Sequence, residues 1–146
     1  MKKFIFILLI LSFYSFNAQA LSVDMNRIKQ IESSGNVFAF NEGSKARGLY
    51  QFRKIAWQDV QNHYPKLKKY EYTKYVFNKE ISTIFCEKYF LILEKYLIHY
   101  NLEINIENLL IAWHDGIGNL IKYKNNKRKL GNEMKGFLKK YKNNLI

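Results

Sequence analysis

One segment, residues 72–100, constrains the fold of this chain more than any other. Its apolar side chains recur at spacings of three and four positions, which is the period of an amphipathic helix. The pattern predicts one long helix at the centre of a helical domain. Its members are Ile81, Ile84, Phe85, Tyr89, Ile92, Leu93, Tyr96, Leu97 and Tyr100. Shorter segments with helical patterns cover residues 23–33, 54–63, 106–115, 118–125 and 132–141.

A glycine-containing segment, "GNVFAFNEGSKARGLY" at residues 35–50, separates the first two predicted helices. It holds three of the seven glycines and predicts a loop, with room for a short strand pair. Loops of this length in a compact domain usually carry function. The expected fold class is therefore mainly α, a single compact helical domain with a long loop after its first helix. The length of 146 residues also favours one domain.

The first twenty residues have the pattern of a secretory signal peptide. A basic start at Lys2 and Lys3 precedes an apolar run over residues 4–16, and Ala18-Gln19-Ala20 has the small-x-small pattern of a cleavage site. We predict a signal peptide at 1–20, a mature domain at 21–146, and export to the periplasm or the extracellular space. The alternative is an uncleaved anchor, but the run is shorter than the roughly 18 residues of a spanning helix. No cysteine follows the run, which excludes a lipoprotein anchor there, and no later run predicts an integral membrane segment.

The composition is strongly basic, with a formal net charge of +12. Without Lys2 and Lys3 the chain keeps 22 basic against 12 acidic groups. On an exported protein this charge suggests an anionic partner such as cell wall or a membrane surface, and we expect no nucleic acid partner. A general bias toward Lys, Asn, Ile and Tyr would also produce it. The densest basic segment, residues 122–129, is either an anchor for anionic polymer or a solvated helix end and loop.

Cys86, the single cysteine, excludes an intramolecular disulfide and is predicted to be a buried apolar residue.

The carboxylate Glu32 stands in an unusual place. Met25, Ile28 and Glu32 are spaced i, i+3 and i+7, so the carboxylate shares a helix face with apolar side chains. It also falls in the last helical turn, because Gly35 is a typical residue just beyond a helix end. Apolar neighbours and the negative end of the helix dipole both predict a raised pKa for Glu32, as a general acid requires. The alternative is a slightly rotated helix that exposes Glu32 to solvent.

Three short elements occur in order along the chain: "ESSGN" at 32–36, "ARGLYQF" at 46–52 and "AWHDGIGN" at 112–119. Together they resemble the soluble lytic transglycosylase domain of the lysozyme-like superfamily, which carries Glu-Ser-x-x-Asn, Gly-Leu-Met-Gln and Ala-Tyr-Asn-Ala-Gly elements. The resemblance implies a lysozyme-like α+β fold with a glycan-binding groove. It also implies cleavage of the bond between N-acetylmuramic acid and N-acetylglucosamine in the glycan strands of peptidoglycan.

The resemblance implies roles for individual residues. Glu32 matches the family's single catalytic acid/base, and the substrate-binding positions fall on Ser33, Tyr50, Gln51, Trp113 and His114. Tyr50 replaces the usual methionine, Trp113 the usual tyrosine and His114 the usual asparagine. Because an indole donates only through its one N–H, Trp113 cannot reproduce every hydrogen bond of a tyrosine hydroxyl.

Several alternatives stay open at this point. In the family's reaction the 6-hydroxyl of the sugar attacks the anomeric carbon, so one carboxyl serves twice and no cofactor is expected. If Asp115 faced the groove as a second carboxylate, a hydrolytic muramidase would result. The other interpretation of Asp115 is a helix-end residue that contacts backbone or Arg/Lys. His114 either binds substrate or packs. A third function is a non-catalytic, cationic wall-binding protein.

The aromatic residues near the motifs allow two interpretations. They either stack on sugar rings or belong to the core; they are Tyr50, Phe52, Trp57, Trp113 and Tyr123. No metal site is expected, because the histidines lack ligand spacing and no cysteine cluster exists. Small one-domain enzymes of the family are often associated with secretion or conjugation assemblies, which makes such an assembly a candidate partner.

Overall fold

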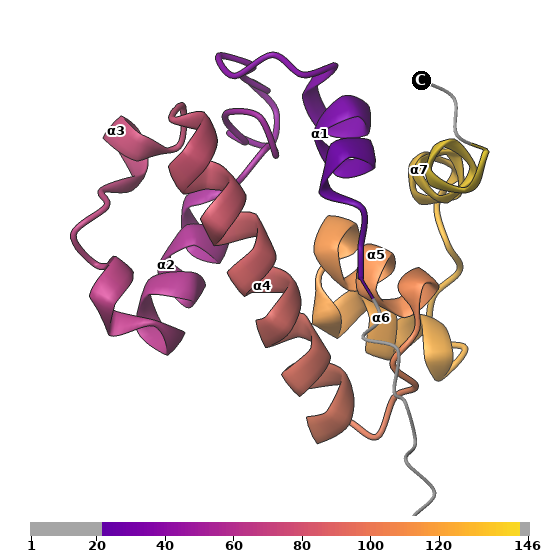
Figure 1. The fold of residues 1–146 in the computed structure, drawn as a ribbon. Coiled ribbons are helices and arrows are strands. Elements are labelled where there is room, and N and C mark those ends of the chain that lie inside the picture. The colour runs from indigo at the N-terminus through magenta and orange to yellow at the C-terminus, as the bar shows by residue number, and fades with distance from the viewer. Residues whose placement is uncertain (1–21, 144–146) are drawn as a thin grey trace, which may run out of the picture.

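The computed structural model describes residues 22–143, so the predicted signal peptide at 1–20 lies outside the described residues. Within 22–143 the chain forms a compact, mainly helical domain of seven α-helices and one 3-10 helix, which confirms the predicted fold class (Figure 1). The helices are α1 (Met25–Ser33), α2 (Lys54–His63), η1 (Pro65–Leu67), α3 (Tyr72–Tyr75), α4 (Lys79–His99), α5 (Ile106–Asp115), α6 (Ile117–Lys124) and α7 (Asn132–Lys142).

The prediction of one helix over 72–100 is wrong at its N-terminal end. The segment forms two helices, α3 and α4, and the long helix begins only at Lys79. The break has a local cause: the side chain of Asn78 accepts a hydrogen bond from the backbone N–H of Ile81 at 2.9 Å. This is the N-cap interaction, which starts a new helix rather than continuing an old one. Asp24 caps α1 in the same way, so that helix starts at Met25 rather than Val23.

The core lies around α4, which crosses the middle of the molecule in Figure 1. Its buried side chains include Phe85, Ile92 and Leu97, and it contacts α1, α2, α5 and α6. Cys86 is fully buried on the same helix, as predicted, and burial raises the pKa of its thiol well above the ordinary value of 9.0. The domain is therefore held by apolar packing about one central helix.

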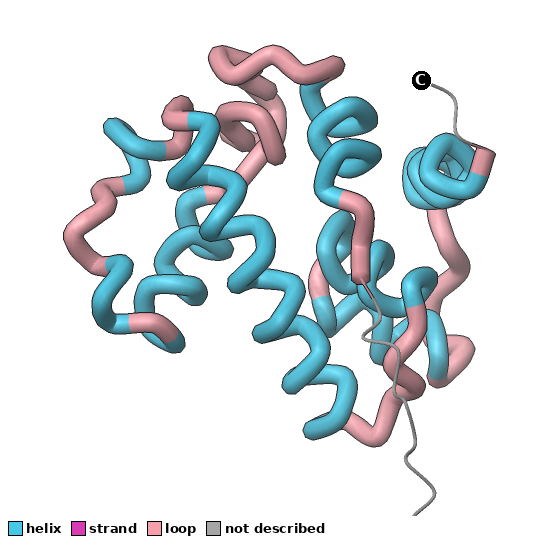
Figure 2. Tube along the Cα trace, in the orientation of Figure 1, coloured by secondary structure: helices cyan, strands magenta, loops and turns pink. Residues whose placement is uncertain are grey.

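The loop between α1 and α2 is ordered by its backbone rather than by a sheet. Within the described part of the chain the only β-type pairings are isolated bridges, Phe40 with Arg47 and Arg47 with Phe52, and Figure 2 draws the segment as loop. Gly48 adopts a φ of +76° there, and a Cβ at this position would lie 2.2 Å from the carbonyl oxygen of Val76. The loop thus presses against the turn between α3 and α4, and only glycine fits at the contact.

No helix between residues 22 and 143 is both long enough and apolar enough to cross a bilayer.

Candidate active site

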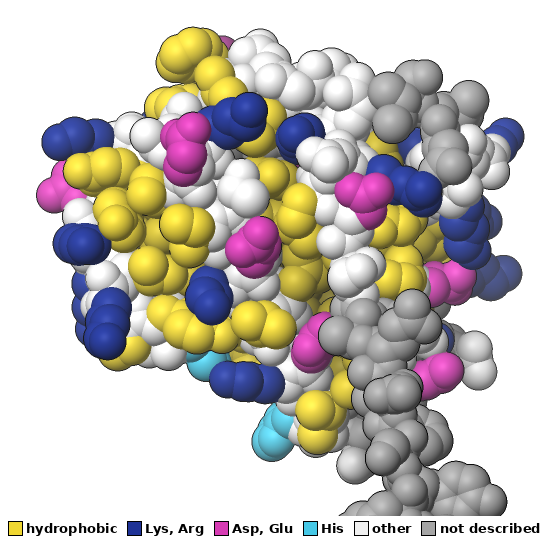
Figure 3. Space-filling view, viewed as in Figure 1, with side chains coloured by type: hydrophobic (Ala, Val, Ile, Leu, Met, Phe, Trp, Pro, Cys, Tyr) yellow, Lys and Arg dark blue, Asp and Glu magenta, His cyan; other side chains and the backbone are white. Residues whose placement is uncertain are grey.

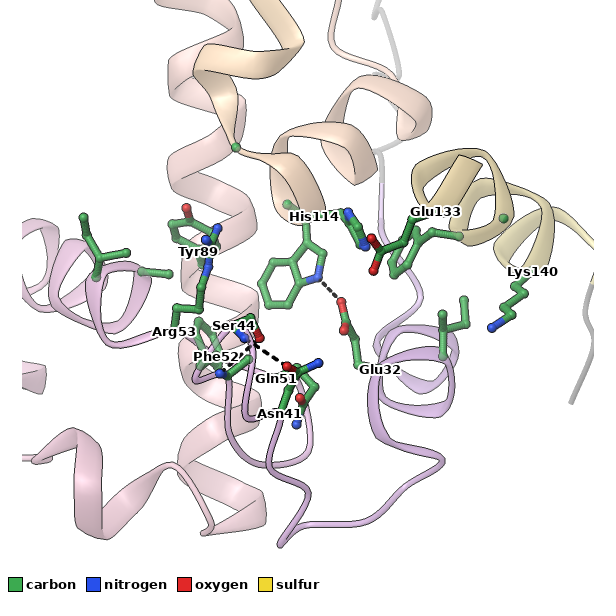
Figure 4. Close-up of a pocket in the computed structure, with 18 residues that line it drawn as sticks. Glu32, Asn41, Ser44, Gln51, Phe52, Arg53, Tyr89, His114, Glu133 and Lys140 are labelled. Atoms are coloured by element: carbon green, nitrogen blue, oxygen red, sulfur yellow. Dashed lines mark hydrogen bonds between the residues drawn. The ribbon is translucent and has the colours of Figure 1, made fainter. Parts of the chain in front are cut away.

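A groove of about 540 Å³ opens between two groups of elements. One wall comes from α1, α5 and α7, and the other from the α1–α2 loop and the start of α2, with Tyr89 of α4 beside Arg53 (Figure 4). The lining side chains include Glu32, Gln51, Arg53, Trp113, His114, Glu133, Phe137 and Lys140. Four of the predicted site residues, Glu32, Gln51, Trp113 and His114, therefore meet in one groove although up to 82 positions separate them in the sequence.

Glu32 projects from the last turn of α1 into the groove rather than into open solvent (Figure 4). Its Oε1 accepts a hydrogen bond of 2.8 Å from the indole Nε1–H of Trp113. Burial raises the pKa of Glu32 above its ordinary value of 4.5, while the bond from Trp113 and the nearby charge of His114 act in the opposite direction. Burial is the largest effect, so the carboxyl holds its proton more strongly than an exposed glutamate would.

Trp113 is fixed by aromatic neighbours. Its ring stacks on Phe90 with centroids 4.9 Å apart and an interplanar angle of 13°, and it meets Phe52 edge-on at 5.4 Å. The one N–H of the indole is used on Glu32, so it has no donor left for a sugar hydroxyl. The position predicted to bind substrate therefore orients the carboxyl, and it can touch substrate only through its carbon atoms.

The side chains of Gln51 and Ser33 each form a hydrogen bond to a backbone carbonyl of the α1–α2 loop. Gln51 has a left-handed backbone, with φ of 48°, and its Nε2 donates to the carbonyl of Gly48 at 3.0 Å while the side chain lines the groove. The Ser33 hydroxyl lies 2.8 Å from the carbonyl oxygen of Leu49 and 3.0 Å from that of Lys29. Ser33 does not line the groove; it ties the loop to the end of α1 instead.

Tyr50, another predicted substrate-binding residue, is in the core. Only 2% of its surface is exposed, and its hydroxyl pairs with the hydroxyl of Thr83 on α4 at 3.0 Å. The structure therefore separates Tyr50 from the groove that its neighbour Gln51 lines. The cause is the tight turn at Gly48 to Gln51, which directs consecutive side chains to opposite sides of the loop.

The other aromatic candidates divide between core and groove. Trp57 is fully buried, stacks on Phe85 with centroids 3.6 Å apart, and donates its N–H to the carbonyl of Tyr70. Phe52 belongs to the core, with 2% of its surface exposed, although it borders the groove. The hydroxyl of Tyr123 is bound to Asp115. Only Phe52 and Trp113 among the five candidates border the space a ligand could enter.

Asp115 ends α5 but does not line the groove. Its Oδ1 is 2.6 Å from Nδ1 of His114, and its Oδ2 accepts from the hydroxyl of Tyr123. Its backbone carbonyl accepts from the side chain of Asn119 at 2.8 Å. The expected backbone contact is present, but the partners of the carboxylate are His114 and Tyr123, where Arg or Lys was expected. Asp115 thereby fixes the ring of His114, which does line the groove.

The sequence did not predict the part of the groove that α7 lines. Glu133, Gly136, Phe137 and Lys140 on α7 line it at spacings of three, four and seven. That spacing on one face of a predicted helix was the available signal. It lies outside the three motifs, and the sequence alone does not say which face of α7 meets α1. Arg53 on the opposite wall was missed for a similar reason, because it is the residue immediately before α2.

The basic segment at 122–129 covers the end of α6 and the turn after it, and its basic side chains are exposed. Arg128 donates to the side chain of Asn119 at 2.9 Å and lies over the ring of Tyr123. Across residues 22–143, no group of three or more His, Cys, Asp or Glu side chains is arranged to hold a metal ion.

Comparison of the chain with models of protein families, with curated proteins and with solved structures gave no match.

Proposed function

We propose that this protein is an exported peptidoglycan lytic transglycosylase that acts in the periplasm or the extracellular space. The observation that carries the proposal is the state of Glu32: a carboxyl inside a groove, held by the indole of Trp113, with a pKa raised by burial. The substrate class comes from the resemblance of the three sequence elements to the soluble lytic transglycosylase domain. The groove volume of about 540 Å³ lies within the usual range of ligand sites, roughly 300 to 1,000 Å³.

The proposed reaction uses Glu32 twice. Its proton passes to the glycosidic oxygen as the bond from that oxygen to the anomeric carbon of N-acetylmuramic acid breaks. The ionised carboxyl then takes the proton of the 6-hydroxyl as the 6-oxygen bonds to the anomeric carbon and closes the 1,6-anhydro ring. No water is consumed, and Glu32 ends in its starting state. Catalysis of each proton transfer by a positioned group contributes roughly 10² to 10⁴ in rate.

Two features of the site support this use of Glu32. Burial favours the protonated form that the first step needs, and the N–H of Trp113 stabilises the ionised form that the second step needs. A carboxyl with both influences can change state within one cycle. Gln51 and His114 lie on the two sides of Glu32 as polar groups able to hold sugar hydroxyls or the acetamido group.

The test is digestion of purified peptidoglycan by the chain from residue 21 onward, with the soluble products identified by mass spectrometry. The proposal predicts products that end in 1,6-anhydro-N-acetylmuramic acid. Glu32→Gln should reduce their release by about 10² or more, because an amide cannot donate and accept the proton. Glu80→Gln is the matched control, since Glu80 also lies near a helix end but is exposed and outside the groove. Binding to insoluble wall without any soluble product would instead favour the non-catalytic wall-binding protein.

A further inference from the structure

A second carboxylate, Glu133, lines the groove on α7, the helix that packs beside α1. Figure 4 shows the two carboxylates directed toward the same space, Glu32 from α1 and Glu133 from the first turn of α7, with the ring of His114 beside Glu133. Asp115, the second carboxylate considered from the sequence, does not line the groove and is bound by His114 and Tyr123. The groove therefore holds two carboxylates, and the second one belongs to α7.

The relative position of the two carboxylates is fixed by direct bonds between their helices. The N–H of Asp24, at the cap of α1, donates to the hydroxyl of Tyr141 at 2.8 Å. One turn further on, the Nη1 of Arg27 donates to the carbonyl of Tyr141 at 3.1 Å. Phe137, one turn after Glu133, is buried and packs on the ring of His114 with centroids 5.0 Å apart. These contacts between α1, α5 and α7 hold Glu133 at the groove in a fixed position relative to Glu32.

The environments of the two carboxylates differ in the way that an acid and a base require. Glu32 is enclosed, and burial raises its pKa. Glu133 is exposed and lies in the first turn of α7. Its negative charge raises the pKa of Glu32 further. Two carboxyl groups with opposed environments are the usual arrangement for cleavage of a glycoside by water.

We propose that Glu133 is a second catalytic residue, which activates a water molecule in the groove and gives the protein a hydrolytic activity beside the lytic one. This inference rests on the proposed function of Glu32. In the hydrolytic route the proton of Glu32 passes to the leaving oxygen, and the bond from that oxygen to the anomeric carbon breaks. The water oxygen bonds to the anomeric carbon, and its proton goes to Glu133. One water is consumed, and proton exchange with solvent returns both carboxyls to their starting states.

The two routes leave different ends on the glycan, which allows them to be counted separately. Lytic cleavage gives a 1,6-anhydro ring that borohydride does not reduce, and hydrolysis gives a reducing N-acetylmuramic acid. Peptidoglycan is first treated with unlabelled borohydride, so that existing reducing ends are spent. It is then digested with the chain from residue 21 onward and treated with borodeuteride. Mass spectrometry then gives the ratio of deuterated alditol ends to newly formed anhydro ends.

We expect the wild type to form both kinds of end. Glu133→Gln should lower the ratio of hydrolytic to anhydro ends by at least about 10²-fold, the lower end of the range for loss of a general base, while anhydro ends continue to form. The ratio is the readout because loss of the Glu133 charge also acts on Glu32 and changes both rates together. Glu80→Gln, an exposed glutamate in the first turn of α4, is the matched control and should leave the ratio unchanged.

Three results would overturn the inference. They are a wild type that makes anhydro ends alone, a Glu133→Gln variant with an unaltered ratio, and a Glu133→Gln variant that is folded by circular dichroism but forms neither end. Failure of the proposed function would look different, because Glu32→Gln would then cut as fast as the wild type, or the wild type would release no product. The exposed position of Glu133 makes a folding defect in Glu133→Gln avoidable, and Glu133→Asp offers a second variant that should restore part of the ratio.

Discussion

At the scale of single residues, the account depends on one pair, Glu32 and Trp113. The sequence placed Glu32 on an apolar helix face near a helix end, and the structure shows its carboxyl in a groove with a raised pKa. The role of Trp113 as the hydrogen-bond partner of Glu32 was not predicted from the sequence. Trp113 was expected to touch substrate, but its single N–H is directed at Glu32 and its ring is held by Phe90 and Phe52. Tryptophan at position 113 thus forms a carboxyl–indole pair with Glu32.

Trp113→Phe tests what the N–H of this pair does. The N–H stabilises the ionised form of Glu32, so its loss should raise the pKa of Glu32 further. A general acid acts while protonated, so activity is present below the pKa of Glu32 and falls as the pH rises through it. We therefore predict that the alkaline limb of the pH–rate profile moves to higher pH in Trp113→Phe.

The control for that measurement is Tyr89→Phe. Tyr89 touches the same indole, with ring centroids 5.7 Å apart, but donates nothing to Glu32. Its variant should keep the wild-type pH profile. A limb that stays in place in Trp113→Phe, or moves to lower pH, would mean that the indole N–H does not control the proton of Glu32.

At the scale of elements, two glycines near the groove have opposite effects on stability: one is required by its surroundings, and the other weakens its helix. Gly48 lies in the α1–α2 loop with a positive φ, and a Cβ there would collide with the backbone of Val76. Gly136 lies within α7 on the groove wall, and a Cβ there would meet nothing within 4 Å. The first glycine is required by a close backbone approach, whereas the second leaves a space open and weakens its helix.

Alanine at these two positions should therefore change stability in opposite directions. Gly48→Ala should lower the free energy of unfolding by about 2 kcal/mol or more, through left-handed strain and the clash with Val76. Gly136→Ala should raise it by up to ~1 kcal/mol, the helix propensity difference between the two residues. Urea denaturation of the two variants measures both changes. Equal destabilisation by the two substitutions would contradict the packing described for α7 and the loop.

The elements also show how far sequence reasoning reaches. Helical periodicity located α2 and α5 at their observed bounds. It joined α3 to α4, because apolar spacing continues across the break, and the cause of the break is one side-chain hydrogen bond at Asn78. It did not predict that α7 lines the groove, because the contact between α1 and α7 depends on tertiary hydrogen bonds from Asp24 and Arg27 to Tyr141. The motif residues Glu32 and Gln51 were found, while the neighbouring Tyr50 was assigned to the wrong side of its loop.

At the scale of the whole molecule, the basic residues that give the net charge of +12 are spread along the sequence. Figure 3 shows Lys and Arg side chains on several edges of the visible face, separated by apolar and acidic ones. The segment at 122–129 is one exposed group among these. This distribution favours a general attraction to anionic polymer over a single anchoring site.

Adsorption to peptidoglycan sacculi tests that interpretation, with Glu32→Gln as background so that the polymer is not consumed. We predict weaker co-sedimentation at high salt, because the screening length falls from about 10 Å at 0.1 M to about 3 Å at 1 M. Changing Lys124, Lys127 and Lys129 to Gln should weaken binding about as much as changing the exposed Lys66, Lys68 and Lys69 to Gln. A much larger loss in the first triple variant would instead identify residues 122–129 as an anchor.

The central claim for the whole molecule is that its fold raises the pKa of Glu32 in the groove. The most direct measurement is a pH titration of the side-chain carboxyl carbon of Glu32 by ¹³C NMR, assigned by comparison with Glu32→Gln. The account predicts a titration midpoint above the ordinary value of 4.5, and a midpoint that rises further in Trp113→Phe. A midpoint at or below 4.5 would contradict it, because Glu32 would then be ionised as readily as an exposed glutamate and would have no special capacity to act as an acid.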